Sequence, residues 1–378
     1  MELTKCKLGE LITQRREKND GSDLPICGVS KDGLIPPKQK DADTSIYNVF
    51  YRDDFIFNPA RMELNSIAIN DMYDRAICSS LYEVFYVHRT DLLLPHYLKL
   101  IIRQKWFTRY CEFLGQGSAR EYCRFGNISE IEIEFPPIKE QQKIVDYNTA
   151  IENRIALKQK INDNLANTEQ LILYQAISKN QTIPLSLNEI AEFIDGDRGK
   201  NYPTFDEFST SGFCLFLNAS NVTSSGFNFD SCMFVTEEKD KIMRNGHLLL
   251  NDIVFTSRGT LGNVALYDKN IKYKNVRINS GMLIIRPKGI NLSPYFIYAL
   301  LKSNYMKSAI EQFRSGSAQP QLPIKDLQNI TFDIPESQNV LDDLEYRFFE
   351  IEETISINKR EIGNLSELAS ILLARLSR

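Results

Sequence analysis

Two stretches of this 378-residue chain are close matches to each other: GSAREYCRFGNISEIEIEFP, residues 117–136, and GSAQPQLPIKDLQNITFDIP, residues 316–335. They share their length, their first three residues and their final proline, and they lie 199 residues apart. The match continues upstream at the same offset, where Pro95-His96-Tyr97 corresponds to Pro294-Tyr295-Phe296. A period of half the chain is too long for stacked repeats of roughly 20–50 residues. The sequence therefore predicts one domain plan that is used twice.

Each copy is followed by a segment with a helical hydrophobic pattern. From Lys139 to Ser178 there is neither glycine nor proline, and apolar or semi-apolar residues recur every three or four positions, with one double step past Lys158. The second copy repeats this spacing from Val340 to Leu376. Such a seam is typical of a long helix that packs on another helix.

We expect the two helices to pack on each other in antiparallel fashion, so that the second returns the chain to the first domain. The buried Asn358 would then set their register. The alternative is that each helix is solvated and packs only on its own domain. The seam residues expected to make the helix and partner contacts are Ile144, Ile151, Ile155, Leu165, Ile172, Ile351, Ile355, Ile362, Leu365 and Leu372.

The other segments alternate short β-like runs, such as Ile253-Val254-Phe255, with helical ones, such as Pro294 to Phe313. This alternation is typical of mixed structure. We predict an α+β fold in which two pseudo-twofold-related domains of mixed α/β structure are separated by two long helices, packed as an antiparallel coiled coil. The predicted segments are a first domain at 1–137, a central helix at 138–181, a second domain at 182–336 and a C-terminal helix at 337–378.

Composition indicates a globular protein, because 43% of the residues are hydrophobic. The seven cysteines are scattered without a CxxC pair, and the first residues lack the apolar core of a signal peptide. Both features favour a reducing cytoplasm. No apolar run approaches the ~20 residues that a membrane span needs, so we expect no membrane partner.

The net charge of −4 argues against a purely electrostatic nucleic-acid binder. Its distribution is uneven, because residues 239–277 carry eight basic and three acidic side chains. Residues 336–378 carry nine acidic and five basic ones. We expect the acidic helix to face protein rather than phosphate.

The common catalytic motifs GxxxxGK[ST], GxSxG and HExxH do not occur, and the chain has three histidines. Asp230 with Glu237-Glu238-Lys239 weakly suggests a nuclease carboxylate cluster, but a charged turn explains it better. Phe57-Asn58-Pro59-Ala60 lacks the second proline and the aromatic residue of the amino-methyltransferase motif. We predict no catalytic residue and no metal site in this chain.

Three polar loops carry side chains suited to DNA contact. They are Asp195–Pro203 (DGDRGKNYP), Asn251–Asn263 (NDIVFTSRGTLGN) and Asp53–Arg61 (DDFIFNPAR). Arginine pairs with guanine and asparagine with adenine in the major groove, although a solvated turn is the alternative for any one residue. The candidate DNA-binding residues are Arg198, Lys200, Asn201, Tyr202, Thr256, Arg258, Asn263 and Gln319 in the second copy, and Asn58, Arg61 and Arg120 in the first.

This plan resembles the specificity subunit of type I restriction-modification systems along the whole chain. The resemblance lies in two diverged domains that end in GSA…FP stretches, each followed by a long helix, here from Glu140-Gln141-Gln142-Lys143 onward. DGDRGKNYP, SRGTLGN and FNPAR look like parts of the target-recognition domains of that family. The first copy has GSAREYC in place of GSAQPQL and no counterpart of DGDRGKN, so the two domains should read different sequences.

The resemblance implies that each domain reads one half of a split double-stranded DNA site, while the helices set the spacing and dock two methyltransferase subunits. It also implies partners that carry the cofactors: S-adenosylmethionine in the methyltransferase, and ATP with Mg²⁺ in a motor and nuclease (restriction) subunit. This chain would hold none. The alternatives are a stand-alone DNA nuclease or methyltransferase, and a coiled-coil protein scaffold without DNA contact.

Overall fold

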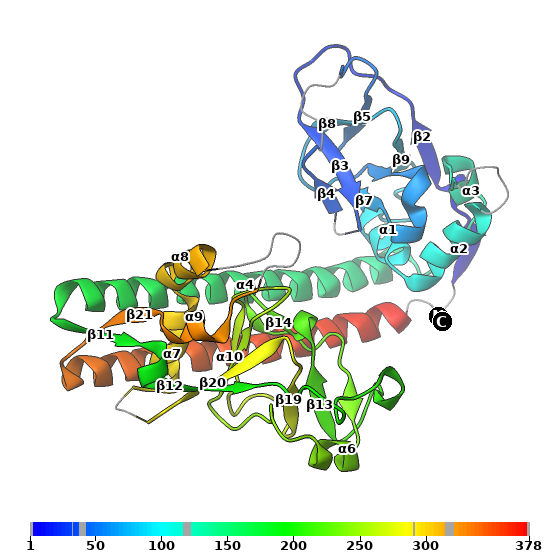
Figure 1. The fold of residues 1–378 in the computed structure, drawn as a ribbon. Helices are drawn as coiled ribbons and strands as arrows, with labels where there is room; N and C mark the ends of the chain where they lie inside the picture. The colour runs from blue at the N-terminus through cyan, green and yellow to red at the C-terminus, as the bar shows by residue number, and fades with distance from the viewer. Residues whose placement is uncertain are drawn as a thin grey trace. The chain divides into compact units, whose positions relative to one another are not determined.

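The computed structural model of the chain describes residues 3–31, 33–37, 43–115, 122–289, 292–313 and 321–375 (Figure 1). Its backbone contacts separate two compact units. The first unit is Met1–Ala156 with Gly363–Arg378, and the second is Leu157–Ile362. Two long helices, α4 (Ile138–Lys179) and α10 (Gln338–Arg375), each contribute residues to both units.

The first unit contains a four-stranded sheet with the order β2-β9-β6-β7, a second sheet with the order β4-β3-β8-β5, and the pair β1-β10. Its strands are β1 (Thr4–Lys7), β2 (Ile12–Arg15), β3 (Ile26–Ser30), β4 (Gly33–Ile35), β5 (Asn48–Tyr51), β6 (Phe55–Phe57), β7 (Ile67–Ile69), β8 (Arg75–Cys78), β9 (Glu83–Val87) and β10 (Glu132–Phe135). Its shorter helices are α1 (Pro95–Ile102), α2 (Lys105–Gly115), α3 (Phe125–Ser129) and the 3-10 helices η1 (Leu8–Glu10) and η2 (Pro59–Leu64).

The second unit contains a four-stranded sheet with the order β12-β20-β17-β18, a three-stranded sheet with the order β16-β13-β19, and the pairs β11-β21 and β14-β15. Its strands are β11 (Thr182–Ser186), β12 (Ala191–Asp195), β13 (Cys214–Leu217), β14 (Val222–Thr223), β15 (Gly226–Phe227), β16 (Phe234–Val235), β17 (Ile253–Thr256), β18 (Val264–Leu266), β19 (Val276–Ile278), β20 (Met282–Pro287) and β21 (Thr331–Pro335). Its shorter helices are α5 (Leu187–Ile190), α6 (Glu237–Ile242), α7 (Pro294–Lys302), α8 (Asn304–Phe313), α9 (Ile324–Gln328), η3 (Phe205–Glu207) and η4 (Ala219–Asn221).

The strand connections confirm that one plan is used twice. The order β2-β9-β6-β7 in the first unit matches β12-β20-β17-β18 in the second, and all these neighbours are antiparallel. In each unit a second sheet contains one parallel pair, β3 with β8 and β13 with β19. The mixed α and β structure predicted from the sequence is therefore confirmed.

The repeated stretch forms the part of each copy that leads into a long helix. Its two copies form α3 and β10 in the first unit, and α9 and β21 in the second, at matching positions. Each strand pairs with the strand that opens its copy, β10 with β1 and β21 with β11. Apolar and polar residues alternate, so that Phe332 and Ile334 are buried while Asp333 is exposed. Helix α4 or α10 then begins within three residues.

Within the second unit α4 and α10 pack antiparallel, as predicted. Asn358 is 6% exposed, accepts a hydrogen bond from Lys158 Nζ at 2.8 Å, and donates one to Asn162 Oδ1 at 2.8 Å. Lys158 Nζ also lies 2.7 Å from Glu361 Oε2. Farther along α4, Ile172 shares a groove with Leu344. Because rising numbers on α4 meet falling numbers on α10, the alternative of two separately solvated helices is wrong here.

The described residues contain no helix that is both long enough and apolar enough to cross a membrane.

Candidate DNA interface

Five segments of the second domain meet at one place, which we call the loop cluster: residues 195–203, 241–247, 257–263, 279–281 and 321–322. Arg198 Nη2 donates to the Ser280 carbonyl at 3.2 Å, and Asn201 Nδ2 donates to the Ile242 carbonyl at 3.0 Å. The Arg244 amide donates to Asp197 Oδ2 at 2.9 Å. These bonds join segments 195–203, 241–247 and 279–281.

Glycine is required where the first segment crosses the fourth. A Cβ atom on Gly196 would lie 2.2 Å from the carbonyl oxygen of Asn279, closer than real Cβ contacts allow. A Cβ atom on Gly246, whose φ is +90°, would lie 3.3 Å from the Cα of Gly196. The first glycine of the DGDRGKN sequence therefore permits close packing of two backbones.

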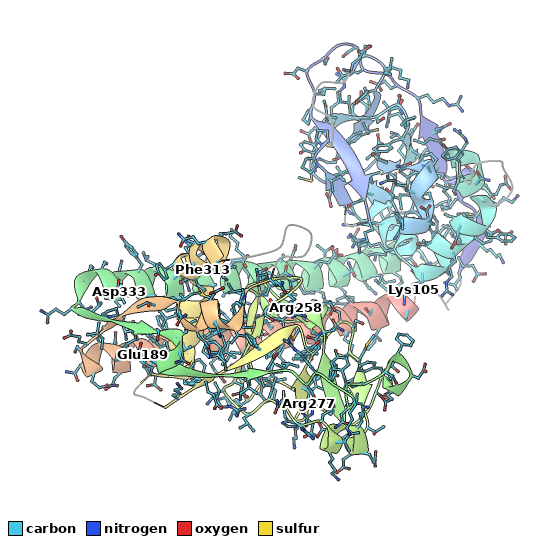
Figure 2. All side chains as sticks on the ribbon, in the orientation of Figure 1. Lys105, Glu189, Arg258, Arg277, Phe313 and Asp333 are labelled. Atoms are coloured by element: carbon cyan, nitrogen blue, oxygen red, sulfur yellow. The ribbon has the colours of Figure 1, made fainter. Side chains whose placement is uncertain are left out.

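The third segment is held by its neighbours on both sides. The Ser257 amide donates to the Gly281 carbonyl at 3.0 Å, and the Leu322 amide donates to the Ser257 carbonyl at 3.4 Å. The backbones of Arg258 and Gln321 form a β-bridge. Gln321 and Leu322 of the repeated stretch therefore lie against the SRGTLGN loop, and Arg258 is exposed there (Figure 2).

The predicted second-domain residues divide into exposed cations and internal supports. Arg198, Lys200 and Arg258 are exposed, although Arg198 also pairs with Asp195 at 3.0 Å. The half-buried Tyr202 packs its ring on Phe216, with 5.6 Å between centroids. The fully buried Thr256 hydroxyl bonds to the Thr260 carbonyl, Asn263 Nδ2 donates to the Val222 carbonyl at 3.0 Å, and Asn201 makes the bond described above.

Part of the basic excess between residues 239 and 277 is neutralised inside the domain. Lys239 pairs with Glu207 at 2.8 Å, and the buried Arg277 pairs with Asp240 at 2.5 Å. Lys269 pairs with Glu353 of α10 at 3.2 Å. Arg244, which is exposed, and Gln321 are loop-cluster residues that our candidate set omits. The excess of basic residues between 239 and 277 points to Arg244 in the sequence. The β-bridge that places Gln321 beside Arg258 is visible only in the structure.

The first domain has a smaller version of this arrangement. Asn58 Oδ1 accepts from the Ala60 amide at 3.1 Å and caps η2, while Arg61 is exposed. The Cys123 amide donates to the Pro59 carbonyl at 3.0 Å. This bond corresponds to the one from the Leu322 amide to the Ser257 carbonyl in the second domain. The predicted contacts Arg120 and Gln319 lie outside the described residues.

A buried carboxylate supports the start of the corresponding strand in each domain. Asp252, before β17, accepts two bonds of 2.7 Å from Arg286 of β20. Asp54, before β6, accepts bonds of 2.6 and 3.1 Å from Arg15 of β2. Burial raises the pKa of Asp54, and the bonds from Arg15 oppose that shift. The two domains thus anchor the same position with arginines from different strands.

The ten seam residues named above are all buried or half-buried. Ile351 and Ile355 are buried, and the others are half-buried. Ile144 packs on the core of the first domain and Ile172 on that of the second. Large apolar side chains outside the seam are exposed, including Leu157, Leu171, Tyr174 and Tyr346. Tyr147, which continues the seam spacing between Ile144 and Ile151, is exposed as well.

Among the described residues, no three His, Cys, Asp or Glu side chains gather where they could hold a metal ion. Glu237 and Glu238 begin α6 behind the capping hydroxyl of Thr236, which suits acidic residues at a helix N-terminus. These carboxylates therefore have a local structural role.

Comparison with known families decides the class of protein. The model of the type I restriction modification DNA specificity domain matches residues 6–167 and again residues 184–363. The chain belongs to this DNA specificity family. It is a specificity subunit of the type I restriction-modification kind, and its role is DNA recognition rather than catalysis. The family carries no cofactor of its own.

Two relatives of this specificity subunit agree with the assignment. The type I restriction enzyme MjaIX specificity subunit of Methanocaldococcus jannaschii is 22% identical over 303 residues, which are 76% of this chain and 69% of that protein. The crystal structure of a type I restriction-modification S subunit from M. genitalium has a TM-score of 0.64 at 17% identity, covering 99% of this chain and 96% of that one. The similarity to the M. genitalium structure shows that the two chains share a fold.

Proposed function

We propose that the two domains of this specificity subunit each read one half of a split, asymmetric site in double-stranded DNA. The observation that carries the proposal is the pairing of one strand order with two different sets of loops. The second domain presents Arg198, Lys200 and Arg258 on its loop cluster, whereas the first presents Arg61 within η2. Different side chains on one scaffold would read different bases.

Within the loop cluster, the proposed division of labour follows from burial. Arg198, Lys200 and Arg258 would contact DNA, because their charged ends are exposed. Thr256, Asn263 and Asn201 would position those cations, because their polar groups bond within the domain. Gln319 and Arg120, near the start of the repeated stretches, remain proposed DNA contacts.

We further propose that α4 and α10 set the distance between the domains and dock two methyltransferase subunits. Tyr174 of α4 is 69% exposed and Tyr346 of α10 is 66% exposed, although both lie on helices whose other faces are packed. Exposed aromatic residues are enriched at protein interfaces. The acidic charge of α10 would face protein rather than phosphate.

In this proposal the assembled complex methylates adenine in the cytoplasm. S-adenosylmethionine is bound by the methyltransferase subunits, and ATP with Mg²⁺ by the restriction subunit that the complex recruits. The specificity subunit contributes DNA recognition, spacing and docking.

Native mass spectrometry of the chain co-expressed with its methyltransferase tests the stoichiometry. We expect two methyltransferase subunits per specificity subunit. Replacing Tyr174 and Tyr346 together by serine should lower that occupancy, while the same change at the half-buried Tyr202 of the loop cluster should leave it intact. A wild-type complex with one methyltransferase, or none, would contradict the proposal.

A further inference from the structure

A cluster of ionisable side chains joins the second domain to both long helices. Lys302, the last residue of α7, has its Nζ 2.6 Å from Glu169 Oε2 of α4 and also pairs with the Glu352 carboxylate of α10. Its Nζ lies 4.3 Å from the centroid of the Tyr298 ring. The Glu169 side chain is 0% exposed and that of Glu352 is 9% exposed. One ammonium group thus connects three helices inside the protein.

Neighbouring contacts hold α7 at the same place. Gln170 Nε2 of α4 donates to the Ala299 carbonyl of α7 at 3.2 Å. Phe296 of α7 stacks on Phe348 of α10, with 6.2 Å between centroids. Lys359 of α10 also donates to the carbonyl of Ser225, in the turn between β14 and β15. Helix α7 therefore packs on both α4 and α10 (Figure 1).

Charged groups at this position need an explanation other than stability. Apolar side chains of similar volume fill such a space at least as well, because buried ions lose their hydration. Burial raises the pKa of Glu169, the Lys302 ammonium lowers it and the nearby Glu352 raises it, so that on balance Glu169 keeps its proton at neutral pH. What a buried cluster of ionisable groups provides is direction, since its contacts form in only one arrangement of the three helices.

The first domain has a weaker counterpart at the matching position. Arg103, 199 residues before Lys302, follows α1 and places Nη1 2.7 Å from Glu152 Oε1 of α4. This pair is 37% and 41% exposed, and solvent weakens such pairs. The residue 199 positions after Glu169 is Leu368, so the second carboxylate has no equivalent there.

We propose that the cluster of Glu169, Lys302 and Glu352 fixes the orientation of the second domain on the helix pair, and thereby the position of the DNA half-site that this domain reads. Lys302 is a positioning residue in this scheme and does not touch DNA. The inference rests on the proposed function, since it assumes half-sites at a set distance.

The test is methylation by the assembled complex of DNA substrates whose half-sites are at the preferred spacing or one base pair closer or farther. Replacing all three cluster residues by methionine removes the ions without leaving an unpaired buried charge. We expect this variant to fold and to recognise the same bases. Its preference for the wild-type spacing should fall about tenfold, comparable to the effect of one mismatched base pair.

Two further variants separate positioning from general stability. Lys302→Arg, which installs the residue of the first copy, should keep the preference, and Arg103→Met should leave it largely intact. An unchanged preference in the triple variant, its failure to fold, or an equal loss in Arg103→Met would overturn the inference. A wild-type complex that shows no spacing preference would instead overturn the proposed function, and the inference with it.

Discussion

Lengthening both long helices by one heptad should lengthen the gap between the DNA half-sites. The insertions go between Ala156 and Leu157 in α4 and between Ile362 and Gly363 in α10, where the two units divide. They leave the polar contacts of Asn358 with Lys158 and Asn162 unchanged. The second domain and its part of the helix pair thus stay as they are.

The size of the change follows from helix geometry. Seven residues add ~10.5 Å of rise and ~700° of rotation, within ~20° of two full turns, so the apolar seam stays aligned. At ~3.4 Å per base pair the added length corresponds to about three pairs. DNA twist opposes that change because the duplex turns once in ~10.5 pairs. We expect the preferred gap to grow by about one to three pairs.

The assay is sequencing of methylated adenines after the variant complex acts on a library of half-sites at different spacings. The recognised bases should stay the same while the gap grows. As a control, the same heptad in α4 alone leaves seven residues without a partner and should reduce assembly instead of moving the gap. Methylation at the original spacing by the doubly extended complex would refute the idea that these helices set the distance.

Other consequences concern the loop cluster and the buried ions. Arg258→Ala and Lys200→Ala should each weaken specific DNA binding, by ~1–3 kcal/mol if the side chain contacts a base, or with a shallower salt dependence if it contacts phosphate; unchanged affinity in both would exclude these loops. Gly196→Ala places a Cβ 2.2 Å from a backbone carbonyl and should impair binding, whereas Gly126→Ala meets no atom within 4 Å and should not. Burial raises the pKa of Glu169 to about 8 in the folded protein, whereas a glutamate in the unfolded chain has a pKa of about 4.3. The stability that the bound proton of Glu169 contributes is therefore complete below about pH 4.3 and is lost as the pH rises through about 8. The wild-type Tm should therefore fall relative to that of Glu169→Gln between about pH 5 and pH 9, and parallel Tm curves would contradict this reasoning.

Most of the fold could be predicted from two features of the sequence, the repeat at an offset of 199 residues and the helical spacing of apolar residues. The matched stretches at 117–136 and 316–335 form the same short helix and strand, because a fixed offset preserves local structure. The glycine-free seam predicted α4, and the polar Asn358 within an apolar seam predicted the layer where α4 and α10 meet. The four predicted segment boundaries remain a prediction, since each helix contributes to both compact units.

The candidate site was less predictable because residue type does not reveal burial. Thr256 and Arg258 are two residues apart in one motif, yet the first is buried and the second exposed. Lys239 and Arg277 look like DNA contacts by charge, but each has an acidic partner within its own domain. Tertiary contacts decide which cations remain at the surface.

Exchanging one domain tests whether the two domains read DNA independently. Residues 184–335 would be replaced by the equivalent domain of another member of the specificity family, and methylated adenines mapped by sequencing after assembly. We expect one half of the recognised sequence to change, while the other half stays the same. A chimera that alters both halves, or neither, would contradict two independent readers on one helical spacer.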